Sequence, residues 1–150
     1  MNERDLVAMS LPPDVHLGLH HVGVVVADLE GALRRYRALG FGQGDRFEVP
    51  EQGVIAVTFR SGPGYVELIH PTDPDGPIAR FLAKRGDGVH HVAYRVGDLR
   101  ATLDRLAVAG VRLIDAAPRT GTHGWRIAFV HPESCAGVLT ELVEVRETGE

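Results

Sequence analysis

The sequence predicts an α+β fold in which two tandem βαβββ modules form one curved sheet. The chain repeats itself at an offset of 70 positions, with nine identities between residues 19–42 and 89–112. The identical pairs are His20/His90, His21/His91, Val22/Val92, Val26/Val96, Asp28/Asp98, Leu29/Leu99, Leu33/Leu103, Arg35/Arg105 and Gly40/Gly110. A repeat of this kind indicates one structural unit used twice. Packing two such units buries the apolar stripes of their helices and leaves a concave sheet face, where ligands tend to bind.

The predicted elements divide the chain of 150 residues into an arm, two modules and a linker. Residues 1–17 show no clear period and are expected to form an N-terminal arm. A single domain follows over residues 18–150, with modules at about 18–70 and 88–146. A linker at 71–87 contains a short helix at 78–84. A chain of this length is typical of one compact domain.

The first module begins with a buried strand, because residues 20–26 are mostly β-branched and apolar. Asp28 stands at the N-cap position of a helix over 29–39. Gly40 is placed to end that helix in the left-handed conformation. Three further strands are expected at 41–48, 54–59 and 65–69.

The second module repeats this order. A strand over 90–96 leads to Asp98, a second N-cap, and to a helix over 99–109 that ends at Gly110. The remaining strands are expected at 111–114, 126–130 and 137–145. The segment 118–124 contains two glycines and is expected to be a mobile loop.

Composition excludes several classes of partner and location. The net charge is −4 and no run of Lys and Arg occurs, so a nucleic-acid partner is not expected. The longest apolar runs are far shorter than the ~20 residues that span a bilayer, so no membrane partner is expected. The lone cysteine, Cys135, cannot form an internal disulfide, and no secretory signal is evident. We therefore expect a cytoplasmic protein.

Strand alternation orients the duplicated histidines. His21 and Gly23 share one face of the first strand, and His91 lies on the equivalent face of its repeat. The small residue two positions after each histidine leaves clearance for a site. On the same alternation, His20 and His90 point to the opposite faces, so only one histidine of each pair is expected to serve the concave site.

An acid also stands inside an apolar run in the last strand of each module, Glu67 in the first and Glu141 in the second. An ionised carboxylate in such surroundings is costly unless it is paired or bound to a metal. Taken singly, each histidine and each acid is more often structural. Taken as duplicated pairs, His21, Glu67, His91 and Glu141 predict a divalent-cation site. Imidazole and carboxylate ligands suit Zn²⁺, Co²⁺, Ni²⁺, Fe²⁺ or Mn²⁺.

These residues resemble the vicinal oxygen chelate superfamily and, within it, the methylmalonyl-CoA epimerase family, over about residues 18–145. The matching stretches lie at 20–24, 50–54, 66–71, 77–82, 86–93, 110–115, 129–132 and 137–142. The resemblance implies the glyoxalase-like fold, with paired modules forming a cup around a metal. It implies His21, Glu67, His91 and Glu141 as the ligands of Co²⁺, Zn²⁺, Ni²⁺ or Mn²⁺.

The same resemblance implies a reaction. An acyl-CoA, methylmalonyl-CoA, is interconverted between its 2R and 2S forms by removal of the C2 proton, through an enolate that the metal stabilises. Relatives commonly form dimers, so a homodimer is expected.

One catalytic group of the family is missing. Some members carry a glutamate, proposed as a base, three residues after the glycine of the Glu51-Gln52-Gly53 motif, and here that residue is Ala56. Epimerisation needs a proton removed from one face of C2 and delivered to the other, so two groups are the simpler scheme. Glu67 and Glu141 are therefore expected to double as the two bases.

Substrate contacts are expected from the segment 118–124, in particular from Arg119, Gly121 and Gly124. Its place between strands suggests a flap over the carboxylate or thioester of the substrate. Arg119, Lys84 and Arg85 are within reach of CoA phosphates on this prediction, although solvated loop charges are at least as good an interpretation.

Two other functions fit much of the pattern. One is a glyoxalase-type isomerase acting on a glutathione hemithioacetal, against which the epimerase-like stretches at 70–82 and 129–142 argue. The other is a non-catalytic drug-binding module of the same fold, which has no need of four ligands. A dioxygenase is disfavoured, because such enzymes bind iron through two histidines and one carboxylate and leave the other positions open, whereas this chain offers a fourth ligand.

Overall fold

The elements follow one another twice in nearly the same order. Over the part of the chain that the computed structural model describes, residue 16 and residues 18–145, there are eight strands and three α-helices. The first module contains β1 (Gly18–Val25), α2 (Leu29–Ala38), β2 (Asp45–Val49), β3 (Val54–Ser61) and β4 (Gly64–Pro71), and α3 (Pro77–Arg85) follows it. The second contains β5 (Gly88–Arg95), α4 (Leu99–Val108), β6 (Arg119–Thr120), β7 (Arg126–Val130) and β8 (Thr140–Glu144). Single 3₁₀ turns are η1 (Pro50–Gln52), η2 (Thr122–Gly124) and η3 (Pro132–Ser134). The predicted arm lies outside the described residues, except for His16.

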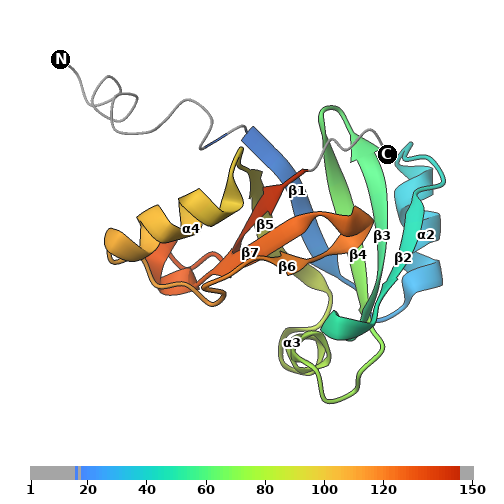
Figure 1. Ribbon diagram of the computed structural model, residues 1–150. Coiled ribbons are helices and arrows are strands. Elements are labelled where there is room, and N and C mark those ends of the chain that lie inside the picture. The colour runs from blue at the N-terminus through green and yellow to red at the C-terminus, as the bar shows by residue number, and fades with distance from the viewer. Residues whose placement is uncertain (1–15, 17, 146–150) are drawn as a thin grey trace.

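Each module supplies half of one curled sheet, whose strand order is β2-β3-β4-β1-β5-β8-β7-β6 (Figure 1). In each half the first strand runs parallel to the last, β1 to β4 and β5 to β8. The halves join where β1 and β5 pair antiparallel at the centre of the sheet. The predicted α+β fold of two βαβββ modules is confirmed, and the two strands that carry the duplicated histidines lie side by side.

The predicted helix ends are also present. Asp28 and Asp98 each accept a hydrogen bond from the backbone N–H three residues on, at 3.0 Å in both modules. Gly40 and Gly110 follow α2 and α4 with φ of 104° and 81°, in the region that favours glycine. Each α-helix has ten residues or fewer, and none that the structure describes is long and apolar enough to cross a membrane.

Apolar side chains attach each helix to the sheet. Leu33 of α2 packs against Phe59 and Leu68, and Leu103 of α4 packs in the same way against Ala128 of the second module. The helix α3 packs elsewhere, against the end of the cup. Its contacts join Ile78, Phe81 and Leu82 to Val25, Val49, Val54 and Ile69.

Three predicted strands differ from the structure. The strand predicted at 41–48 begins only at Asp45, and the one predicted at 137–145 is the shorter β8. Residues 111–114 form no strand and make a single isolated bridge, between Leu113 and Val130. The carboxylate of Asp115 accepts the N–H of Phe129 at 2.9 Å, which takes that donor out of a regular ladder. The outermost strand, β6, forms instead inside the segment predicted as a loop.

Candidate metal centre and active site

Two β-bulges shape the centre of the sheet. The register of β1 against β5 shifts by one residue between Leu19 and His21, so His20 is an extra residue on β1. It shifts again after Gly23, so that His90 is an extra residue on β5. A bulge interrupts the two-residue period and re-aims a side chain. The prediction that His20 and His90 point away from the site is therefore wrong.

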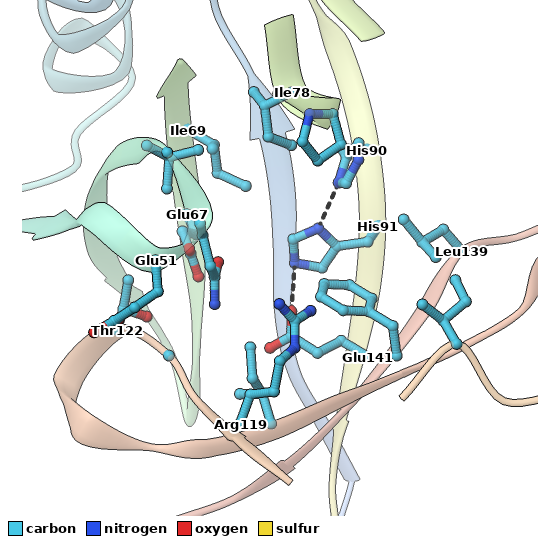
Figure 2. Close-up of a pocket in the computed structure, with 18 of the residues that line it drawn as sticks. Glu51, Glu67, Ile69, Ile78, His90, His91, Arg119, Thr122, Leu139 and Glu141 are labelled. Atoms are coloured by element: carbon cyan, nitrogen blue, oxygen red, sulfur yellow. Dashed lines mark hydrogen bonds and ion pairs between the residues drawn. The ribbon is translucent and has the colours of Figure 1, made fainter. Parts of the chain in front are cut away.

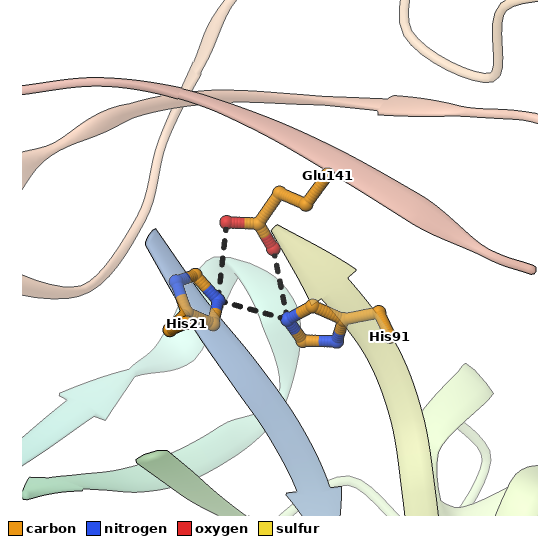
Figure 3. A group of neighbouring side chains, drawn as sticks. All are labelled: His21, His91 and Glu141. Atoms are coloured by element: carbon orange, nitrogen blue, oxygen red, sulfur yellow. Dashed lines mark hydrogen bonds and ion pairs between the residues drawn. The ribbon is translucent and has the colours of Figure 1, made fainter. Parts of the chain in front are cut away.

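The four residues predicted as ligands converge inside the cup. Nε2 of His21 lies 3.0 Å from Nε2 of His91, and Nε2 of His91 lies 3.2 Å from Oε2 of Glu141 (Figure 3). Nε2 of His21 also lies 3.6 Å from Oε1 of Glu141 and 3.3 Å from Oε2 of Glu67. Each of the four residues is at most 8% exposed.

The repeat explains why these side chains meet. Glu67 on β4 pairs with Gly23 on β1, and Glu141 on β8 pairs with Ala93 on β5, which is the equivalent place in the second module. The predicted clearance is present as well. A Cβ atom on Gly23 would lie 2.2 Å from Cε1 of His91, so the ring occupies the space that the glycine leaves.

The spacing suits a metal ion. Ligand atoms about 2.0–2.2 Å from one ion, at right or tetrahedral angles, stand roughly 2.8–3.6 Å apart. The separations above fall in this range. His21, His91 and Glu141 each offer a ligand atom within 4.8 Å of the others. Glu67 is not part of this group of three, although it lies 3.3 Å from Nε2 of His21. Two imidazoles and a carboxylate match the preferences of divalent transition metals.

Burial and charge set the protonation of the cluster. Burial lowers the pKa of His21 to about 3, against the attraction of Glu141. Burial also acts to lower the pKa of His91, but the charge and hydrogen bond of Glu141 outweigh it, so that this pKa is raised. Burial and the negative charge of Glu141 raise the pKa of Glu67 to about 7. Burial acts to raise the pKa of Glu141 too, but the neighbouring His91 lowers it overall. The two carboxylates thus compete for positive charge, and a bound cation would stabilise both in their ionised forms.

A second histidine stands behind each inner ring. Nδ1 of His20 lies 2.7 Å from Nδ1 of His21, and Nδ1 of His90 lies 3.0 Å from Nδ1 of His91. Burial lowers the pKa of His20 and of His90 to about 4, so both rings are neutral near pH 7. Sequence reasoning set these residues aside on strict alternation. Their duplication at both sites was the signal that could have found them.

The cluster opens into a cavity of about 310 Å³, which is in the range of small-molecule sites (Figure 2). Figure 2 shows Glu67 on one side of the view and Glu141 on the other. Of the predicted substrate contacts, Arg119 and Gly121 line this cavity, whereas Gly124 is not among its lining residues. Sequence reasoning missed the other wall residues, which include Glu51, Ile69, Ile78, Thr122, Ile127 and Leu139.

The segment between β6 and β7 links the second module to the first. His123 in η2 has a left-handed φ of 57°, and its Nε2 lies 2.7 Å from Oγ1 of Thr58 on β3. Its ring stacks on Trp125 with centroids 4.3 Å apart. Arg119 forms an ion pair with Asp115, with Nε 3.1 Å from Oδ1. The segment predicted as a loop therefore contains ordered contacts on both sides of the cup.

Comparisons with known proteins place the chain in a family. The family model of the Glyoxalase/Bleomycin resistance protein/Dioxygenase superfamily matches residues 20–129. An ethylmalonyl-CoA/methylmalonyl-CoA epimerase of Cereibacter sphaeroides is 39% identical over 130 residues, covering 85% of this chain and 97% of that protein. The chain belongs to the methylmalonyl-CoA epimerase family. A mitochondrial methylmalonyl-CoA epimerase of Bos taurus is also 39% identical, over 126 residues that cover 83% of this chain and 72% of the relative.

Solved structures of methylmalonyl-CoA epimerases share the fold. The crystal structure of the Mycobacterium tuberculosis epimerase matches with a TM-score of 0.85 at 39% identity, covering 91% of this chain and 93% of that one. An epimerase in complex with methylmalonyl-CoA and NH4+ matches with a TM-score of 0.82 at 36% identity, covering 89% and 96%. The predicted resemblance is confirmed. Membership of the epimerase family argues against the glyoxalase-type and drug-binding alternatives.

The variant Gly23→Ala tests the clearance around His91. The added Cβ would lie 2.2 Å from Cε1 of His91, so the ring must leave its place beside Glu141. We expect the affinity for Co²⁺ to fall by at least ~10-fold, as for other changes that misorient a ligand. Isothermal titration calorimetry measures it. Gly42→Ala is the matched control, because nothing lies within 4 Å of its Cβ position. Equal Co²⁺ affinity in both variants would contradict the role given to the clearance.

Proposed function

We propose that this chain is a metal-dependent epimerase that interconverts the 2R and 2S forms of methylmalonyl-CoA. The observation that carries the proposal is the buried pair of carboxylates, Glu67 and Glu141, at equivalent places of two modules around two histidines. The family relationship supports the substrate. The cavity of about 310 Å³ suits the methylmalonyl group, while the rest of CoA extends outside it.

His21, Glu67, His91 and Glu141 would hold the divalent ion, which we propose to be Co²⁺, Zn²⁺, Ni²⁺ or Mn²⁺. Two neutral imidazoles and two ionised carboxylates carry a net charge of −2, which one such ion balances. When bound, the ion would stabilise the negative charge that develops on the oxygens flanking C2. Each of the four residues is buried, so few of their polar atoms face bulk solvent.

Proton transfer falls to the two acids. Inversion requires one group to take the C2 proton and another to return a proton on the opposite face. Glu67 and Glu141 come from different halves of the sheet. This placement supports giving proton removal to one of them and proton return to the other. Ala56 offers no proton-transfer group and is fully buried in β3. We assign the two bases to Glu67 and Glu141.

A groove beside the cavity offers a path for the CoA arm. The two hollows share the lining residues Pro77, His90, His91 and Leu139, so they are neighbours. Cationic residues of α3 line the groove, namely Arg80, Lys84 and Arg85. Cations at such a place suit the phosphates of CoA. We further propose a homodimer in the cytoplasm, on the family resemblance and the lone free cysteine, Cys135.

Proton exchange at C2 tests the activity directly. In D₂O, the Co²⁺-loaded protein should replace the C2 proton of methylmalonyl-CoA with deuterium, seen in proton NMR as loss of its signal. Chelator-treated protein should not accelerate the exchange. His91→Ala should lose both the bound ion and the exchange, because it removes a ligand atom. Absence of exchange with the metal-loaded native protein would rule out the proposed activity.

The variant Glu67→Gln separates the two roles given to Glu67. Its amide oxygen can still bind a metal, but it cannot accept the C2 proton. We expect Co²⁺ to remain bound and epimerisation to fall ~10²–10⁴-fold, the usual range for one general base. Metal content by elemental analysis and turnover by coupled assay measure these effects. Near-native turnover with bound metal would leave Glu67 as a ligand only.

Arg119 and Lys84 are expected to contact different parts of the substrate. Arg119→Ala should raise the KM roughly tenfold for methylmalonyl-CoA and equally for methylmalonyl-pantetheine, because a charge-assisted hydrogen bond to the carboxylate is lost. Lys84→Ala should raise the KM only for the CoA ester, since the shorter ester lacks the nucleotide phosphates. An unchanged KM for both esters in Arg119→Ala would show Arg119 to be a solvated charge.

A further inference from the structure

We infer that His20 and His90 are positioning residues that hold the rings of His21 and His91 in the tautomer needed to bind the ion. Neither is among the proposed ligands. The inference rests on the proposed metal site, and it concerns the contacts behind that site. Both contacts join Nδ1 to Nδ1, at 2.7 Å in the first module and 3.0 Å in the second.

The direction of each hydrogen bond follows from the metal site. A neutral imidazole has one N–H and one nitrogen with a lone pair. His21 and His91 turn Nε2 toward the shared site, so an ion bound there leaves the proton of each ring on Nδ1. That Nδ1 must then donate. His20 and His90 are the acceptors, through an unprotonated Nδ1, and carry their own proton on Nε2.

The backbone is built to make these contacts. On a regular strand, neighbouring side chains point to opposite faces and their rings cannot meet in this way. The bulges at His20 and His90 bring both members of each pair to one side. The same irregularity occurs at equivalent positions of the two modules, although the strands differ at most other places. The geometry is therefore produced twice.

Packing keeps the two acceptor rings in place. The rings of His20 and Trp125 meet edge to face with centroids 4.4 Å apart, and the ring of Tyr65 lies 5.4 Å from His20. His90 meets Phe81 of α3, with centroids 5.0 Å apart. Metal-bound histidines usually donate to a carboxylate, a carbonyl or water. A neutral imidazole fixes the ring without adding negative charge to a site that already holds two carboxylates.

The test uses His90, because it is half-buried whereas His20 belongs to the core. In His90→Asn, the side-chain oxygen takes the place of Nδ1 and can still accept the hydrogen bond. In His90→Leu, a side chain of similar bulk has no acceptor. We expect the leucine variant to bind Co²⁺ ~10–100-fold more weakly, the usual loss when such a contact is removed. The asparagine variant should bind close to the native affinity.

Two readouts are needed besides affinity by calorimetry. The visible absorption spectrum of bound Co²⁺ should change in His90→Leu, because the His91 ring is free to turn, and should be restored in His90→Asn. Thermal unfolding shows whether each variant is folded. His70→Leu is the matched control. His70 is also a half-buried histidine, but its Nδ1 contacts the carbonyl of Val26 at 3.1 Å, and it does not line the cavity. Its affinity and spectrum should stay native.

Native Co²⁺ affinity in His90→Leu would overturn the inference. Equal weakening in the asparagine and leucine variants, both folded, would also overturn it, since bulk rather than the acceptor would then matter. These outcomes differ from failure of the proposed function, in which the native protein itself binds no stoichiometric Co²⁺. The pair His20→Asn and His20→Leu should repeat the pattern in the first module.

Discussion

The antiparallel pairing of β1 with β5 is the constraint on which the rest of the structure depends. The two modules join along these strands, so residues 70 positions apart in the chain face each other across the centre of the sheet. The bulges at His20 and His90 add twist and bring four imidazoles to one place. Two acids then reach the same point from the strands beside them, Glu67 on β4 and Glu141 on β8.

Burying two carboxylates and four imidazoles together is unfavourable, and this burial shifts their pKa values. Buried carboxylates and imidazoles lose their hydration and must be stabilised by one another or by an ion. Burial and the charge of Glu141 raise the pKa of Glu67, while His91 lowers that of Glu141 against the effect of burial. Two acids whose environments separate their pKa values are the pattern of an acid and base pair. The same pair is available to bind a cation.

The surroundings divide the substrate into two parts. The end of the cup formed with α3 and the ordered segment between β6 and β7 leave a small cavity, which Glu67, His91 and Glu141 line. The contact of His123 with Thr58 holds that segment against the first module. The groove lined by Arg80, Lys84 and Arg85 of α3 lies beside this cavity. Chemistry and recognition of the CoA arm can thus involve different residues.

The sequence by itself determined what depends on local pattern or on the repeat. The two modules, the caps at Asp28 and Asp98 and the convergence of His21, Glu67, His91 and Glu141 all followed from residue types at fixed spacing. Only the tertiary structure decided features that depend on pairing between distant segments. The bulges arise from the register of β1 against β5, which no local periodicity contains, and they reversed the expected direction of His20 and His90. Likewise, residues 111–114 have the composition of a strand, but the carboxylate of Asp115 takes a donor of β7, so the edge strand forms at Arg119–Thr120 instead. In each case, contacts between separate segments of the chain outweighed the local preference.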